Sequence, residues 1–191
     1  MTGEPDTDHR PAQAGPLLIV SGPPGAGKST IGRLLADRMT PSALIEGDAF
    51  FRFLRNGLIE PWRVEARHQN EAIMQIQATT AAHYRTAGYE TVYDGVVGPW
   101  FLDTFVAATG PFDYALLLPP VEVCLDRIGA RRDHEFDDAT ATRSLHDQFT
   151  ESCSDDLRRH VFDSAVGSPD EVADRIVATR QSGRLRIDQP T

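Results

Sequence analysis

The segment "GPPGAGKST", residues 22–30, restricts the fold of this 191-residue chain more than any other stretch. It follows the apolar run "PLLIVS" and precedes "IGRLLADRM", in which Ile31, Leu34 and Leu35 have helical spacing. This pattern predicts a buried strand over residues 16–21, a tight glycine-rich turn, and a helix over residues 28–39. The segment also holds Lys28, the only lysine of the chain beside 18 arginines.

The turn fits the pattern G-x-x-x-x-G-K-[ST] through Gly22, Gly27, Lys28 and Ser29. Glycines let the backbone aim its N–H groups at phosphate oxygens, and the following helix adds partial positive charge at its N-terminus. The lysine ammonium is small enough to reach the β- and γ-phosphates inside a tight loop, where the flat arginine fork does not fit. The Ser29 hydroxyl can bind Mg²⁺. The alternative is a glycine- and proline-rich turn with a surface lysine.

We therefore predict a site for ATP and Mg²⁺ in this phosphate loop. Its residues are Gly22, Pro23, Pro24, Gly25, Ala26, Gly27, Lys28, Ser29 and Thr30.

Apolar runs alternate with helix-like segments along the rest of the chain. Further strands are predicted at 42–48, 89–95, 112–120 and 161–165, and further helices at 61–87, 101–110, 121–132 and 168–180, with a charged loop at 133–142. Ser168, Pro169 and Glu171 form a capping-box pattern, and Gly88 fits a helix C-terminal cap. The alternation predicts an α/β fold, with a parallel sheet covered by helices on both faces. Ligands of such sheets bind at the carboxyl ends of the strands.

The helix predicted at 61–87 is amphipathic. Its three- and four-residue spacing places on one face Ile73, Ile76, Thr80, Tyr84 and Ala87.

Composition narrows the class of protein. The formal net charge of −9 argues against a nucleic-acid partner, which would require a basic stripe. No apolar run approaches the roughly 20 residues that span a bilayer, and the polar residues 1–15 lack the features of a signal peptide. We expect a disordered tail over 1–15, a domain over 16–182, a C-terminal tail over 183–191, and a cytoplasmic monomer or homodimer. Cys124 and Cys153 are expected to be reduced, packed thiols.

Four stretches, "LLIVSGPPGAGKSTIGRLLADRM", "ALIEGDAFFR", "YETVYDG" and "ALLLPPVEVCLDRIGARR", resemble the small P-loop kinases. That group contains shikimate kinase, gluconate kinase, adenylyl-sulfate kinase and chloramphenicol phosphotransferase, and the resemblance covers roughly residues 16–180. It implies five parallel strands in the order 2-3-1-4-5, a substrate-binding helical region at about 48–88, and an arginine-bearing lid at about 127–145. It also implies an acidic residue near the acceptor hydroxyl at Asp48, and lid arginines near the transferred phosphate at Arg127, Arg131 and Arg132.

Two carboxylates follow predicted strands. Asp48 is a candidate catalytic base or orienting group for the acceptor, although it could instead cap the helix that starts near Ala49. Asp94 could hold Mg²⁺ together with Ser29, or contact the substrate with Gly95; the alternative is an ordinary turn aspartate. Glu46 points to the other side of its strand and ranks below Asp48.

Arginines supply the remaining candidates. Arg127 is assigned to the nucleotide, and Arg131 is the first choice for stabilising charge on the γ-phosphate, against the alternative that both lie on a solvated face. Among Arg52, Arg55, Arg63 and Arg67, we favour Arg52 for binding an anionic group of the acceptor. The sequence thus predicts an ATP-dependent kinase acting on a small-molecule hydroxyl. The alternatives are a nucleoside or nucleotide kinase, and a nucleotide-binding regulatory protein.

Overall fold

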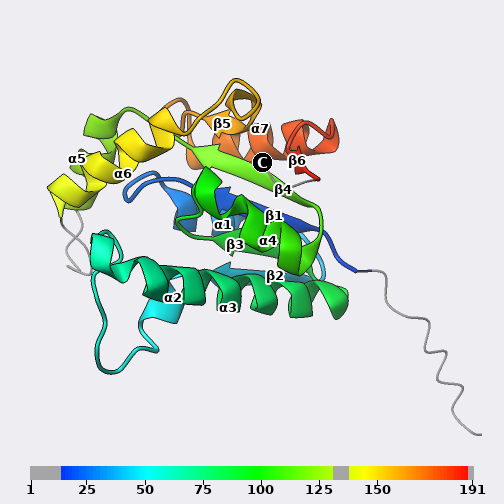
Figure 1. Ribbon diagram of the computed structural model, residues 1–191. Coiled ribbons are helices and arrows are strands. Elements are labelled where there is room, and N and C mark those ends of the chain that lie inside the picture. The colour runs from blue at the N-terminus through cyan, green and yellow to red at the C-terminus, as the bar shows by residue number, and fades with distance from the viewer. Residues whose placement is uncertain (1–13, 131–137, 189–191) are drawn as a thin grey trace, which may run out of the picture.

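The computed structural model describes residues 14–130 and 138–188. Within them, five parallel strands follow the order β2-β3-β1-β4-β5, and a further strand, β6, pairs antiparallel with β4 (Figure 1). The strands are β1 (Leu17–Ser21), β2 (Ser42–Glu46), β3 (Glu90–Asp94), β4 (Phe112–Leu117), β5 (Val161–Phe162) and β6 (Arg186–Ile187). The predicted α/β fold and the order of its five parallel strands are therefore confirmed.

Helices cover both faces of this sheet. They are α1 (Lys28–Ala36), α2 (Asp48–Phe51), α3 (Arg67–Thr86), α4 (Leu102–Thr109), α5 (Val121–Gly129), α6 (Ala139–Glu151) and α7 (Pro169–Gln181), with the short 3-10 helices η1 (Val64–Ala66), η2 (Pro99–Phe101) and η3 (Arg158–His160). Figure 1 shows α3 and α4 together on one side of the sheet and α1 and α7 on the other. None of the helices in the described part of the chain combines the length and the hydrophobicity needed to cross a lipid bilayer.

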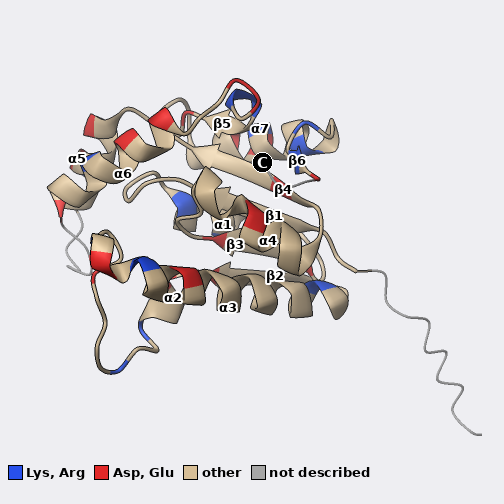
Figure 2. Cartoon of the chain, in the orientation of Figure 1, with Lys and Arg blue, Asp and Glu red and all other residues tan. Residues whose placement is uncertain are grey.

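Strand β1 lies in the middle of the sheet and is buried along its whole length. Leu17 and Ile19 face one core cluster, shared with α3 and α4, whereas Leu18 and Val20 face the other, shared with α1 and α7. A strand covered on both faces is apolar without alternation, which explains the run "LLIVS". In Figure 2 the charged residues lie mainly on helices and loops around the sheet.

Helices α3 and α6 show the largest differences from the prediction, while α1 and α5 end about one turn earlier than predicted, at Ala36 and Gly129. Helix α3 begins at Arg67, not residue 61, and its buried residues are Ile73, Met74, Gln77, Ala78 and Ala81. The predicted face is wrong in part, because Ile76 is 55% exposed while the polar Gln77 is fully buried. The predicted charged loop at 133–142 also runs into α6, whose N-cap Asp138 accepts a hydrogen bond from the Ala141 N–H. Residues 131–137 lie outside the described residues.

The ends of the domain also differ from the prediction. Leu185 is completely buried, Ile187 is 5% exposed, and the Tyr114 N–H donates to the Leu185 carbonyl. Leu185 and strand β6 therefore belong to the folded domain, whereas the prediction placed them in a C-terminal tail. Gly15 donates its N–H to the Arg85 carbonyl and accepts from the Arg85 guanidinium, so it too belongs to the fold; residues 1–13 are not described. The predicted capping box of α7 is confirmed. Gly88, predicted as a helix C-terminal cap, directly follows the C-cap residue Ala87 of α3 and has φ of 87°.

Candidate active site

The phosphate loop joins β1 to α1 and has a backbone that requires glycine. Gly22 has φ of 146°, and a Cβ atom there would lie 2.2 Å from the Leu117 carbonyl oxygen. Gly25 has φ of 79°, and its Cβ would lie 2.3 Å from the Cys124 carbonyl oxygen. Because β4 and α5 approach the loop this closely, residues with side chains do not fit at these two positions.

Lys28 begins α1 and is 9% exposed. Its Nζ atom donates to the Pro23 carbonyl across the loop at 3.1 Å. The N-cap of α1 is Gly27, which provides no side-chain cap. The first N–H groups of α1 therefore point into the loop together with the ammonium group, an arrangement suited to phosphate oxygens.

Asp94 ends β3 beside the phosphate loop, since its Cα pairs with Val20 in the parallel register. Its side chain is buried, and burial raises the pKa of the carboxyl group, while the charge of Lys28 and a hydrogen bond from Ser29 act in the opposite direction. A carboxylate and a hydroxyl are hard oxygen donors of the kind that Mg²⁺ takes. Ser29 and Asp94 would therefore supply two oxygen ligands to Mg²⁺ bound with a nucleotide. Among the described residues, no group of three or more His, Cys, Asp or Glu side chains could hold a metal ion by itself.

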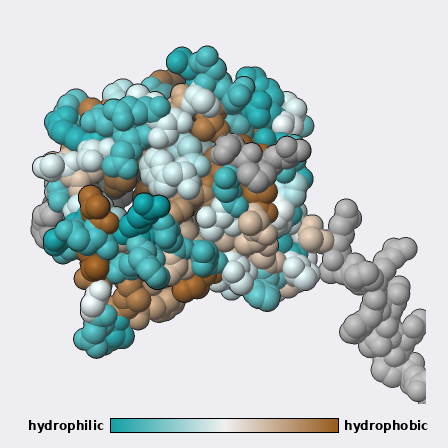
Figure 3. Space-filling view, in the orientation of Figure 1, coloured by the Kyte–Doolittle hydropathy of each residue, from teal (hydrophilic) through white to brown (hydrophobic). Residues whose placement is uncertain are grey.

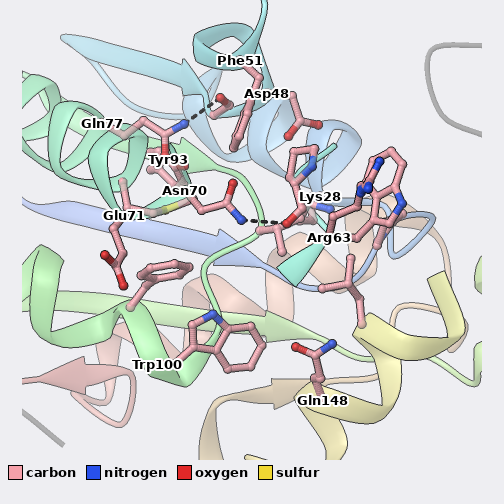
Figure 4. A pocket seen from close by; sticks show the side chains of 18 of the residues that line it. Lys28, Asp48, Phe51, Arg63, Asn70, Glu71, Gln77, Tyr93, Trp100 and Gln148 are labelled. Atoms are coloured by element: carbon pink, nitrogen blue, oxygen red, sulfur yellow. Dashed lines mark hydrogen bonds between the residues drawn. The ribbon is translucent and has the colours of Figure 1, made fainter. Parts of the chain in front are cut away.

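Asp48 is the first residue of α2, directly after β2. The N-cap of α2 is Gly47, so the alternative that Asp48 caps this helix is wrong. The Asp48 side chain is exposed and lines a cavity of about 890 Å³ that also borders Lys28 and Ser29. Figure 4 labels both Asp48 and Lys28 among the residues that line this cavity. Glu46, by contrast, lies 4.0 Å from Arg33 on α1.

The cavity extends from the phosphate loop to α3 and α6. Its walls include Phe51, Trp62, Asn70, Glu71, Val96, Trp100, Leu145 and Gln148. Figure 4 shows Asn70 and Glu71 of α3 on one side and Trp100 and Gln148 on another. Trp62 and Trp100 are 39% and 43% exposed, so aromatic surface is available to a ligand. Figure 3 shows hydrophobic surface gathered beside it, over α2 and the segment that follows, where Phe53, Leu58 and Val64 are exposed.

The arginines of the cavity differ in their surroundings. Arg63 and Arg67 are exposed and lie in ion pairs, Arg63 with Glu60 and Glu65, and Arg67 with Glu71 at 2.9 Å. Arg52 also lines the cavity, whereas Arg55 is exposed outside its walls.

Arg127 lies on the other side of the phosphate loop. Its guanidinium donates to the carbonyls of Gly25, Ala26 and Ser164. It lines a second cavity of about 270 Å³ with Gly27, Thr30 and Val172. Arg127 therefore connects the loop to the segment after β5. The predicted lid residues Arg131 and Arg132 lie outside the described residues.

Gly95 is buried and does not line the larger cavity. A Cβ atom at Gly95 would lie 2.6 Å from the Tyr93 hydroxyl oxygen, so this glycine makes room for the tyrosine ring.

Sequence reasoning missed several polar residues at the cavity, among them Asn70, Gln77 and Tyr93. The Asn70 Nδ2 donates to the Pro61 carbonyl at 2.7 Å, and its Oδ1 is buried without a hydrogen-bond partner. Gln77 and Tyr93 are fully buried and hydrogen-bonded to each other. A glutamine within an apolar helical face was the available signal for Gln77, but the predicted face was displaced by one residue.

Solved structures of kinases share this architecture. A sugar kinase from Janibacter sp. HTCC2649 is 22% identical with a TM-score of 0.70, and the alignment covers 87% of this chain and 95% of that one. A gluconokinase from Sinorhizobium meliloti 1021 is 16% identical with a TM-score of 0.63, covering 90% and 94%. A shikimate kinase from Acinetobacter baumannii, in complex with shikimate, is 21% identical with a TM-score of 0.58, covering 91% and 97%.

At these identities the structural likeness concerns the fold. A search among curated proteins finds no match. A protein-family profile described as an AAA domain, AAA_33, matches residues 17–155, which is well over half of the chain. The chain therefore belongs to this AAA domain family and has the fold of the P-loop kinase superfamily that the sequence motifs resembled.

Proposed function

We propose that the chain is an ATP-dependent kinase that transfers the γ-phosphate to a hydroxyl group of a small molecule. The observation that carries this proposal is a single cavity bordered by Lys28, Ser29 and Asp48. The cavity extends well beyond the phosphate loop, so it offers room for a second substrate next to the triphosphate. The similarity in fold to sugar, gluconate and shikimate kinases agrees with such a reaction.

The phosphate loop and Lys28 bind the triphosphate of ATP, and Ser29 and Asp94 are the residues that would hold Mg²⁺. When bound, Mg²⁺ neutralises charge on the phosphates. The acceptor oxygen forms a bond to the γ-phosphorus, and its proton passes to the Asp48 carboxylate. The bond from the γ-phosphorus to the bridging oxygen breaks, and ADP leaves.

The arginines have separate proposed roles. Arg127 borders the second cavity and the outer side of the phosphate loop, so we assign it to the nucleotide. Arg131 is our candidate for stabilising the transferred phosphate. Arg52 lines the larger cavity and is our candidate for contact with the acceptor.

A nucleoside or nucleotide kinase is a second candidate. Trp62 and Trp100 at the cavity provide aromatic faces on which a base could stack, and Arg52 could bind a monophosphate. A thermal-shift comparison of nucleosides, monophosphates and uncharged alcohols separates the two candidates. Stabilisation by nucleosides or monophosphates alone would favour the second.

The proposed reaction is tested by coupled detection of ADP release over a panel of sugars, sugar acids, nucleosides and antibiotics. We expect acceptor-dependent turnover that falls at least about 100-fold in Lys28→Ala, because the transition state loses a cation at the transferred phosphate. Arg33→Ala is the matched control, since Arg33 is an exposed cation on the same helix. ATP binding without phosphorylation of any acceptor would count against a kinase and for a regulatory nucleotide-binding protein.

A further inference from the structure

Gln77 is a completely buried polar side chain in the middle of α3. Its Nε2 donates to the Gly47 carbonyl at 2.7 Å (Figure 4). Its Oε1 accepts from the Tyr93 hydroxyl, also at 2.7 Å. The amide thus joins the helix over the cavity to the end of β2 and to β3. The reaction described above gives it no part.

The orientation of the Gln77 amide is fixed by its two partners. A backbone carbonyl only accepts hydrogen bonds, so the amide nitrogen must face Gly47. The Tyr93 hydroxyl keeps its proton, because burial and the nearby charges of Asp48 and Asp94 raise the pKa of its phenol well above the ordinary value. Both ends of the amide are therefore satisfied, and loss of the side chain would leave the Gly47 carbonyl without this donor and the buried Tyr93 hydroxyl without this acceptor.

Gly47 is held from both sides by these contacts. Its N–H donates to the Asp94 carbonyl at 2.7 Å, while its own carbonyl accepts from Gln77. A Cβ atom at Gly47 would lie 2.3 Å from the Tyr93 hydroxyl oxygen, so the tyrosine also limits this residue sterically.

The next residue is Asp48, which begins the short helix α2. Helix α2 has four residues and none of them is buried. So short a helix is not stable by its own hydrogen bonds. The direction of the Asp48 side chain is therefore set largely by the residue that precedes it, the N-cap Gly47.

We propose that Gln77 and Tyr93 form a clamp on Gly47 that positions the Asp48 carboxylate toward the acceptor. Gln77 is then a positioning residue for phosphoryl transfer, since it contacts the backbone before Asp48 and acts through it. The inference rests on the proposed function of Asp48. A displacement of about 1 Å in a catalytic group costs on the order of 100-fold in rate, so the clamp should affect kcat more than substrate binding.

Three variants test the clamp. Gln77→Met keeps the length of the side chain and removes both hydrogen bonds, whereas Tyr93→Phe leaves the bond from Gln77 to Gly47 intact. Arg180→Met is the matched control, because Arg180 is a largely buried partner of Asp113 at the opposite end of the sheet. It removes a polar contact of the fold without touching Gly47.

The first measurement requires no substrate. Hydrogen exchange of the backbone amides of residues 49–52 should become at least about 10-fold faster in Gln77→Met than in the control, with a smaller change in Tyr93→Phe. Equal exchange in Gln77→Met and the control would overturn the clamp.

The second measurement uses the acceptor that the panel identifies. We expect Gln77→Met to lower kcat about 10- to 100-fold, with the KM for ATP changed less than about 2-fold. Because Gln77 acts through Asp48, the double variant with Asp48→Asn should be no slower than Asp48→Asn alone. Multiplying effects would overturn the positioning role.

The two failures are distinguishable. A wild-type protein that phosphorylates no acceptor overturns the proposed function, together with the catalytic part of this inference. In that case the exchange measurement still decides whether the clamp exists.

Discussion

The proposed role of Asp94 in holding Mg²⁺ requires a charged carboxylate, whereas its burial in the folded protein disfavours that charge. Burial raises the pKa of its carboxyl group, with Lys28 and Ser29 offsetting part of this effect. The folded state consequently keeps the proton at a higher pH than the unfolded chain does. The unfolding free energy therefore falls as the pH rises from the ordinary value of 3.8 through the raised pKa, and it stays lower above that pH.

We expect Asp94→Asn to raise the thermal midpoint of the nucleotide-free protein at neutral pH, because it removes a desolvated charge. The same variant should lower Mg²⁺-dependent turnover at least about 100-fold. Thermal unfolding and ADP release measure the two effects. Asp155→Asn is the control, since that side chain is 95% exposed and should change neither property appreciably. A lower midpoint for Asp94→Asn would contradict the argument.

The site residues differ in how visible they are in the sequence. Lys28 belongs to a local motif. Asp94 ends one parallel strand and Asp48 lies just after another, and the carboxyl ends of these strands meet at one edge of the sheet. Gln77 and Tyr93 could not be assigned in this way. Their roles depend on hydrogen bonds between β2, α3 and β3, and such contacts leave no periodic pattern in the chain.

At the scale of elements, the start of α3 fastens the segment before it. Gln69 bonds to both the N–H and the carbonyl of Ile59, and Asn70 bonds to the Pro61 carbonyl. This segment carries Trp62 and Arg63 along the cavity. The wall of the proposed acceptor site is therefore a loop fixed by side chains of the neighbouring helix.

The arginines of this wall should contribute little to acceptor binding. We expect Arg63→Ala and Arg67→Ala to change the acceptor KM less than about 3-fold, because both side chains are exposed and already paired with glutamates. Steady-state kinetics with the identified acceptor provide the check, and Lys28→Ala is the inactive reference. An increase of more than 10-fold in KM for either variant would show that the arginine leaves its glutamate partner and binds the substrate instead.

The elements that could not be predicted from the sequence are those whose hydrophobic pattern is short or interrupted. Helix α6 buries Ala141, Thr142 and Phe149. Most of the residues around them are polar or charged, so the segment shows no clear apolar periodicity. Strand β6 has only two residues and is a strand because it pairs with β4. Long apolar runs such as β1 and β4 were predictable because burial on both faces demands them.

At the scale of the whole molecule, His160 connects β4 to β5. Its Nδ1 donates to the Tyr114 carbonyl at 3.0 Å, and its Nε2 accepts from Arg159 Nε at 3.1 Å, so the ring is neutral. Burial is the main cause that lowers the pKa of His160. The hydrogen bond to the Tyr114 carbonyl opposes this effect, the charge of Arg159 adds to it, and Asp113 opposes it weakly. The unfolded chain therefore binds this proton at a higher pH than the folded protein does.

The unfolding free energy should fall as the pH decreases from 6.5 through the lowered pKa of His160. We expect a shallower decline in His160→Gln, whose uncharged amide can make similar hydrogen bonds. Urea unfolding of both proteins between about pH 7.5 and pH 5.5 gives their unfolding free energies. Subtracting one pH profile from the other removes the contribution of the titrating groups that the two proteins share. Parallel pH profiles for the two proteins would exclude His160 as a source of acid sensitivity.

The crowding of Gly47 and Gly95 against the Tyr93 hydroxyl has a consequence for altering the protein's specificity. Any side chain at either glycine would collide with the ring, at 2.3 and 2.6 Å respectively. Directed changes of substrate preference are therefore expected to accumulate at other positions around the cavity, such as Trp62, Asn70, Trp100 and Gln148, while Gly47 and Gly95 stay invariant in a functional library.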